Sequence, residues 1–137
     1  MSQTITALGT VPQRILSVGS ASLSTSYQTL VTFDTHGAEF ASFTMNYTKG
    51  GETSLQTSFE VQLRTTGEWV ALPVVVNSLI QTSDTASTTR AFQFYVGRDT
   101  SSMRIRAKVV GTANGTTALI VDGMLSAPTY PIIGQPN

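Results

Sequence analysis

The chain has 137 residues, of which 40% are hydrophobic and only 12% charged, with eight basic and eight acidic side chains. A length of this order predicts one domain, residues 1–137. A net charge of zero argues against a dedicated nucleic-acid-binding protein, which usually carries a positive excess. The chain has no cysteine, which excludes disulfides and thiolate metal sites. No apolar run approaches the ~20 residues of a membrane span. The N-terminus lacks the pattern of a signal peptide, so we expect synthesis in a cytoplasm.

Apolar and polar residues alternate with period two through most of the chain, and glycine, aspartate and asparagine interrupt them at the spacing of hairpin turns. Helical periodicity is nearly absent. Residues 77–89 form the longest polar connection, and the pattern predicts no element there. The predicted strands are at residues 14–18, 26–33, 39–48, 55–65, 69–76, 90–96, 103–110 and 118–125.

The alternation also predicts which side chains are buried. In the strand 26–33, Tyr27, Val31 and Phe33 share one face with Thr29. The sequence KGGE at 49–52 predicts a tight turn of the kind that two glycines permit, because a positive φ costs glycine little. Trp69 begins an apolar strand and is expected to be mostly buried. The side chains expected in the core are Phe59, Val61, Leu63, Phe92, Phe94, Ile105, Val109 and Ile120.

About eight short antiparallel strands at this spacing predict an all-β fold, a single β-sandwich or jelly-roll-like domain. Its core would comprise about residues 14–125. The polar start of the chain and its Pro/Gly-rich end are expected to be extended arms, at residues 1–13 and 126–137. Apolar side chains near the C-terminus, Tyr130, Ile132 and Ile133, would be the contacts that the second arm makes with a neighbour.

No arrangement of residues in the sequence indicates an enzyme, a cofactor or a metal site. His36 is the only histidine and stands in a predicted turn, so a transition-metal site would need several carboxylates beside it. The eight acidic residues are scattered over turns and polar faces, and no close pair suggests acid–base chemistry. We therefore expect a protein that binds rather than catalyses.

Residues 103–110, MRIRAKVV, place three cations, Arg104, Arg106 and Lys108, on one face of a predicted strand. The opposite face is apolar. Such a row could contact phosphate, although the neutral chain argues against this. It could also be a solvated face that pairs with acids on neighbouring strands. The third interpretation is a protein–protein surface, because arginine is favoured for bidentate pairing with carboxylates.

The stretch FEVQLRTTGEWVALP, a Ser/Thr-rich loop, and then RAFQFYVGRDTSSMRIRAKVVGTANGTTALIVDG resemble small β-sandwich modules in virion proteins of tailed bacteriophages. Those modules share a strand, a glycine-containing turn, a tryptophan that opens the next strand, and a later hairpin of this type. The resemblance covers about residues 55–125 and consists of strand and turn types, without an active site to transfer.

The resemblance implies a structural protein of the phage particle. We expect a capsid decoration (cement) protein that binds the major capsid protein on the outside of the head, with a homotrimer as the favoured state. It would be made in the bacterial host cytoplasm, and no nucleic acid or membrane partner is expected. A head-fibre, tail or baseplate component is one alternative. A carbohydrate-binding β-sandwich is another, for which Trp69 and Tyr95 would have to be exposed.

Overall fold

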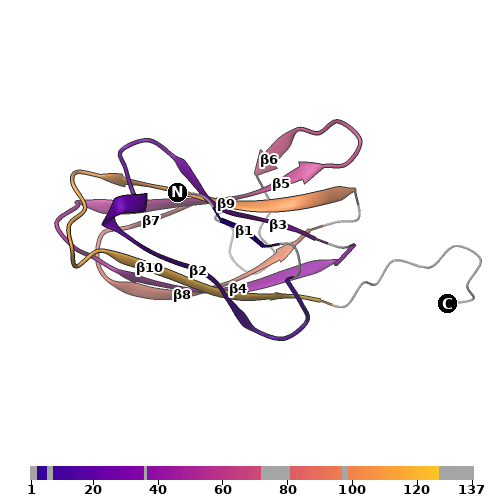
Figure 1. Ribbon diagram of the computed structural model, residues 1–137, viewed down its shortest axis with the longest axis horizontal. Helices are drawn as coiled ribbons and strands as arrows, with labels where there is room; N and C mark the ends of the chain where they lie inside the picture. The colour runs from indigo at the N-terminus through magenta and orange to yellow at the C-terminus, as the bar shows by residue number, and fades with distance from the viewer. Residues whose placement is uncertain (1–2, 6–7, 36, 72–80, 97–98, 127–137) are drawn as a thin grey trace, which may run out of the picture.

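The computed structural model describes residues 3–5, 8–35, 37–71, 81–96 and 99–126 (Figure 1). Within these residues the chain is almost entirely β-structure, with one short 3-10 helix, η1, at Ser20–Ser22. The ten strands are β1 (Gln3–Ile5), β2 (Gln13–Gly19), β3 (Gln28–Asp34), β4 (Phe40–Thr48), β5 (Ser54–Leu63), β6 (Trp69–Ala71), β7 (Gln81–Asp84), β8 (Thr88–Tyr95), β9 (Thr100–Val110) and β10 (Ala118–Leu125).

The strands form two sheets that pack face to face, as the two layers in Figure 1 show. Sheet A has the order β1-β3-β9-β5-β6, with β7 also paired to β5, and sheet B has the order β2-β10-β4-β8. All pairs are antiparallel except β1 with β3, which is parallel. The predicted all-β sandwich is confirmed.

The pairing has the nested order of a jelly roll. β2 pairs with β10, β3 with β9, β4 with β8, and β5 with both β6 and β7. The first half of the chain therefore runs beside the second half in reverse order, like one long hairpin. Folding this hairpin over brings β4 beside β10 and β5 beside β9, and so creates the two sheets.

The core lies between the sheets, where the inward residues of every long strand are buried. Four phenylalanines from both sheets form its centre, with ring centroids 4.8–6.0 Å apart along the contacting pairs. They are Phe43, Phe59, Phe92 and Phe94. Tilted aromatic pairs of this kind add to the free energy gained from burial alone. The predictions for Phe59, Val61, Phe92, Phe94, Ile105 and Val109 are confirmed.

Three predicted core residues lie elsewhere. In β10, Leu119 and Val121 are buried and Ile120 points outward, so the predicted register of this strand was wrong by one residue. Leu63 is only half-buried, because β5 ends there with a register shift against β9. Trp69 is mostly covered, as predicted, but it lies on the outer side of sheet A and not in the core, because it pairs with Gln62.

The connection predicted at residues 77–89 contains two strand segments, which corrects the prediction of no element. β7 pairs with Leu55–Ser58 as an edge strand, and β8 already begins at Thr88. Backbone hydrogen bonds to one neighbouring strand are enough to form such an edge strand. Its sequence therefore need not show alternating hydrophobicity. Part of the predicted N-terminal arm also lies in sheet A, since residues 3–5 are β1.

Candidate interaction surface

Strand β9 presents its three cations on the outer face of sheet A. Met103, Ile105, Ala107 and Val109 are fully buried. Because side chains of a strand alternate between its two faces, the intervening Arg104, Arg106 and Lys108 point away from the core. β9 is a central strand, flanked by β3 and β5. The three cations therefore stand in the middle of the face and not on its edge.

One carboxylate, Glu60 on β5, faces this row. Glu60 is the register partner of Arg104, whose Nη2 lies 2.7 Å from Glu60 Oε1 and whose Nε donates to the same oxygen at 2.8 Å. Arg106 Nη1 lies 3.8 Å from Glu60 Oε2. The cross-strand pairing that the sequence suggested is therefore present for Arg104, and a single acid is shared between two guanidinium groups.

An aromatic ring stands at each end of the row. The Arg104 guanidinium lies 4.3 Å from the ring centroid of Trp69. At the other end, Arg106 and Lys108 lie 5.5 and 4.9 Å from the ring centroid of Tyr27. These are cation–π distances. Burial raises the pKa of the Tyr27 hydroxyl, which stays protonated at neutral pH. We call this set the cation–aromatic row: Tyr27, Lys108, Arg106, Glu60, Arg104 and Trp69.

The row has unused binding capacity. Three cations face one carboxylate within it, which leaves an excess of two positive charges. Arg106 Nε is buried and has no hydrogen-bond partner among the described residues. A buried donor without a partner costs free energy, so Arg106 is held less favourably than Arg104, whose Nε donates to Glu60. Stacking and pairing already hold the arginine side chains in place. Binding a ligand would therefore cost these side chains less conformational entropy.

Sequence reasoning placed two members of the row on the wrong face. Trp69 follows a hairpin in which Gly67 has a φ of 75°, and the hairpin register puts it opposite Gln62, an outward residue. Tyr27 was assigned to the core face with Val31. A register shift in β3 buries both Leu30 and Val31, so the alternation changes phase between Tyr27 and the core. The predicted arm contacts Tyr130, Ile132 and Ile133 lie outside the described residues, as does His36.

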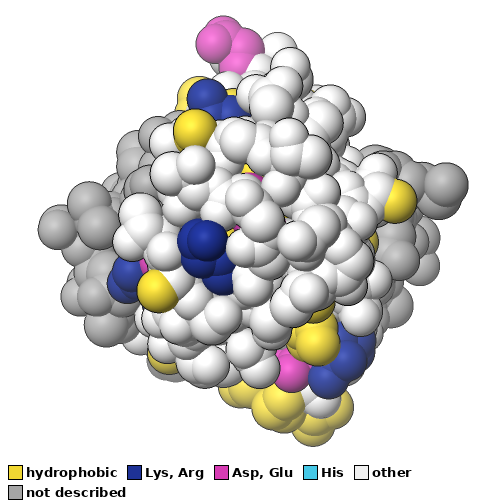
Figure 2. All heavy atoms as spheres, turned by 90° about the vertical axis from the view of Figure 1, so that its left-hand side faces the viewer, with side chains coloured by type: hydrophobic (Ala, Val, Ile, Leu, Met, Phe, Trp, Pro, Cys, Tyr) yellow, Lys and Arg dark blue, Asp and Glu magenta, His cyan; other side chains and the backbone are white. Residues whose placement is uncertain are grey.

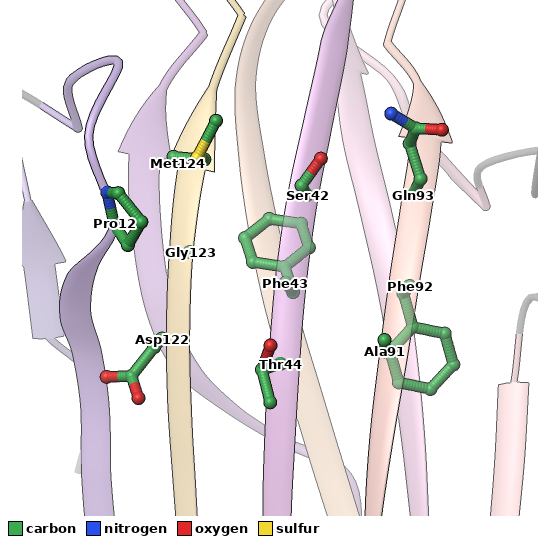
Figure 3. A pocket seen from close by; sticks show the side chains of 10 residues that line it. All are labelled: Pro12, Ser42, Phe43, Thr44, Ala91, Phe92, Gln93, Asp122, Gly123 and Met124. Atoms are coloured by element: carbon green, nitrogen blue, oxygen red, sulfur yellow. The ribbon is translucent and has the colours of Figure 1, made fainter.

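A second surface feature is a shallow hollow of about 310 Å³ on the outer face of sheet B. Figure 3 shows Ser42 and Thr44 of β4 along its middle, with β10 on one side and β8 on the other. Its charged side chain is Asp122, which pairs with Arg14 at 2.6 Å. The lining is otherwise small, polar or apolar, and it brings together no group of titratable side chains.

The third feature is Glu52, a fully buried carboxylate between the β4–β5 and β9–β10 connections. It accepts hydrogen bonds from the Tyr47 hydroxyl, from Thr117 Oγ1 at 2.7 Å and from the Gly50 N–H at 3.2 Å. Burial alone would raise the pKa of the Glu52 carboxyl, but these hydrogen bonds outweigh it and hold the pKa below its usual value. Because these donors come from β4, from its own connection and from the β9–β10 connection, Glu52 links the two connections.

Gly50 permits this arrangement by its small size. A Cβ there would lie 2.3 Å from Thr117 Oγ1 and 2.9 Å from the Thr117 backbone nitrogen. Neither glycine of the KGGE turn uses the positive φ that glycine permits, because the described glycines with positive φ are Gly37, Gly67 and Gly111. The turn needs glycine because the β9–β10 connection approaches it closely.

The end of the sandwich that carries these two connections presents mostly uncharged polar groups and backbone, with charged side chains at a few separate places (Figure 2). Within the described ranges, no three histidine or acidic side chains lie close enough to share a metal ion. The part of the chain that the structure describes also contains no helix long and apolar enough to cross a membrane.

No family model matches the chain, and no curated protein matches its sequence. Solved structures resemble it at low identity. The SPBc2 prophage-derived protein YomS shares 18% identity with a TM-score of 0.47, over 87% of this chain and 97% of that chain. A protein of the disulfide-linked pili that form Bacillus endospore appendages shares 9% identity with a TM-score of 0.47, over 93% and 98%. The K1 cleaved adhesin domain of Lys-gingipain from Porphyromonas gingivalis W83 shares 13% with a TM-score of 0.43, over 85% and 72%. Similarities at this level assign no function.

Proposed function

We propose that this chain is a structural protein of a bacteriophage particle, a decoration protein that binds the outside of the capsid and stabilises it without catalysis. Its partner would be the major capsid protein, and a homotrimer is the favoured state. The observation that carries the proposal is the cation–aromatic row, an ordered, positively charged face in the middle of sheet A.

The composition of the row supports a protein partner. Arginine, tyrosine and tryptophan are the residues most enriched where protein interfaces gain their affinity. A sandwich with a hydrogen-bonded central strand keeps the row rigid, which favours binding. The resemblance of residues 55–125 to phage virion modules points the same way. The jelly roll is also a recurrent fold of viral capsid proteins, although a fold by itself does not determine a function.

The buried acids support binding over catalysis, because each has a structural role. Glu52 is occupied by donors from two connections. Asp84, on β7 of sheet A, accepts a hydrogen bond from Arg90 Nε at 2.7 Å, and Arg90 lies on β8 of sheet B. This pair therefore joins the two sheets. A catalytic carboxylate has to reach a substrate, and both of these are directed into the fold.

A carbohydrate-binding module is the second candidate, because Trp69 lies on an outer face and Tyr95 is 47% exposed. Jelly rolls also occur in lectins. The two rings stand on different sheets, however, so they do not form one platform for a sugar chain. The Arg104 guanidinium also covers the Trp69 ring at 4.3 Å. A glycan array separates the two candidates, since the virion proposal expects no glycan to bind.

The direct test is the protein composition of phage particles purified from the strain that carries the gene. We expect peptides of this chain in purified particles, in a fixed ratio to the major capsid protein. A preparation in which the full-length chain is absent from the particles and remains monomeric in the lysate would contradict the proposal.

A further inference from the structure

The charges and spacing of the cation–aromatic row define the partner more closely. We infer that the row binds an extended acidic segment of a partner protein, which has carboxylates at alternate residues that pair with Arg106 and Lys108. This inference rests on the proposed function, because it names the chemistry of the surface that the chain would bind.

The charges select two of the three cations. Arg104 is already paired, with Glu60 Oε1 2.7 Å from its Nη2 and the Trp69 ring 4.3 Å from its guanidinium. Arg106 is only 3.8 Å from the other oxygen of Glu60 and keeps a buried Nε without a partner among the described residues. No ion pair links Lys108 to a described residue, and its Nζ lies 4.9 Å from the Tyr27 ring. An incoming anion would therefore find Arg106 and Lys108.

The spacing selects an extended segment. Arg106 and Lys108 are two residues apart on one strand, and a strand rises about 3.3 Å per residue, so their stems are about 7 Å apart. Side chains at alternate positions of an extended partner segment have the same period and point to the same side. Two carboxylates at positions i and i+2 would match both cations. Carboxylates at adjacent positions would point to opposite sides, and only one could pair.

The surroundings of the row favour a protein segment over a nucleic acid. A nucleic acid presents one phosphate per residue and gains affinity from each cation it meets. The row offers only two cations without a short ion pair, Arg106 and Lys108, and places Glu60 beside them, and the chain as a whole has no net charge. The tryptophan that could stack on a base already contacts Arg104. Two carboxylates at alternate positions would pair with Arg106 and Lys108. Unlike a nucleic acid, such a segment need not bring further negative charges close to Glu60.

The test uses the full chain and two fluorescein-labelled peptides of identical composition, each with six glutamates and six threonines. In one peptide the residues alternate, and in the other the glutamates come in adjacent pairs separated by two threonines, so that no two glutamates are at positions i and i+2. Fluorescence anisotropy at low salt measures binding to the wild type, Arg106→Gln, Lys108→Gln and the control Arg14→Gln, which removes an exposed cation from sheet B. Trp69 is the only tryptophan, so its emission reports whether binding occurs at this face.

We expect the alternating peptide to bind the wild type roughly tenfold more tightly than the paired-glutamate peptide, the lower end of what a hydrogen bond to a charged group contributes. Arg106→Gln and Lys108→Gln should abolish this preference, and Arg14→Gln should keep it. Equal binding of the two peptides, no binding of either, or a preference that survives Arg106→Gln would overturn the inference. Tighter binding of a dT12 oligonucleotide than of the alternating peptide would also overturn it, in favour of a nucleic acid.

Failure of this test is distinguishable from failure of the proposed function. A chain that is present in purified particles but shows no preference for alternating acids would keep its structural role and lose this recognition chemistry. A chain that prefers the alternating peptide but is absent from particles would keep the acidic partner and lose the virion role.

Discussion

Replacing Glu52 with alanine tests whether the buried carboxylate joins the two connections at one end of the sandwich. The substitution leaves three donors without their acceptor: the Tyr47 hydroxyl, the Thr117 hydroxyl and the Gly50 N–H. Each buried donor without a partner costs roughly 1–3 kcal/mol. Water can enter the space that the side chain leaves, so we use the lower value for each donor. We expect the free energy of unfolding to fall by about 3 kcal/mol, a large part of the 5–15 kcal/mol typical of a domain.

Urea denaturation followed by Trp69 fluorescence measures this change. With a slope of about 2 kcal/mol per molar urea, the midpoint should fall by about 1.5 M. The control is Glu68→Ala, an exposed acid in the β5–β6 hairpin, which should stay within about 0.5 kcal/mol of the wild type. If Glu52→Ala is as stable as this control, the account of the carboxylate as a link between the connections is wrong.

The stability difference between the wild type and Glu52→Ala should also depend on pH. The pKa of Glu52 is lower in the folded chain than its usual value of 4.5, so the folded state binds the carboxylate proton less tightly than the unfolded state. Its contribution is therefore fully present above pH 4.5 and is lost as the pH falls through the folded pKa. The stability difference between the wild type and Glu52→Ala should be constant from pH 7 to 6 and should shrink below pH 4.5. A difference that grows in acid would contradict the assignment.

Three further changes test the core, the close approach at the turn, and the C-terminal arm. Phe59→Ala should lower the free energy of unfolding by about 3–5 kcal/mol in urea denaturation, because Phe59 is 1% exposed amid the phenylalanine cluster; a loss below 1 kcal/mol would contradict the packing. Gly50→Ala should lower the thermal midpoint because its Cβ would clash with Thr117, whereas Gly115→Ala, where the space is open, should not; equal midpoints would refute the close approach. Deleting residues 127–137 removes the predicted arm except Ser126, whose Oγ accepts hydrogen bonds from the Glu39 and Phe40 N–H groups. The deletion should reduce particle binding or self-association and leave the circular dichroism spectrum unchanged, and wild-type particle occupancy would disprove the arm hypothesis.

Much of the fold could be predicted from the sequence because one face of most strands is apolar. In β9 the alternation of Ile105 and Val109 with Arg104 and Arg106 is uninterrupted, so the buried face follows directly from the pattern. In β10 the run of Leu119, Ile120 and Val121 is apolar on both faces, and the pattern does not show which side is inward. Pairing with β2 and β4 decides this, and it is a tertiary effect.

Only the cations of the cation–aromatic row could be predicted from the sequence, because the positions of its aromatic rings depend on pairing between strands. Its cations follow from the alternation within a single strand. Its aromatic ends depend on features between strands, which are the hairpin register that turns Trp69 outward and the irregularity in β3 that separates Tyr27 from the core face. Glu52 was visible only as an acid in a turn, because its partners Tyr47 and Thr117 come from segments that the fold brings together.

Lysine acetylation, read by mass spectrometry on the free chain and on purified particles, tests the central claim that the outer face of sheet A contacts the particle. The chain has two lysines, Lys108 within the cation–aromatic row and Lys49 in the connection after β4, so each molecule carries its own control. We predict that acetylation of Lys108 falls about fivefold or more on particles, while that of Lys49 stays within twofold of the free chain. Equal acetylation of Lys108 in the two states would show that the particle leaves this face uncovered and would contradict the account.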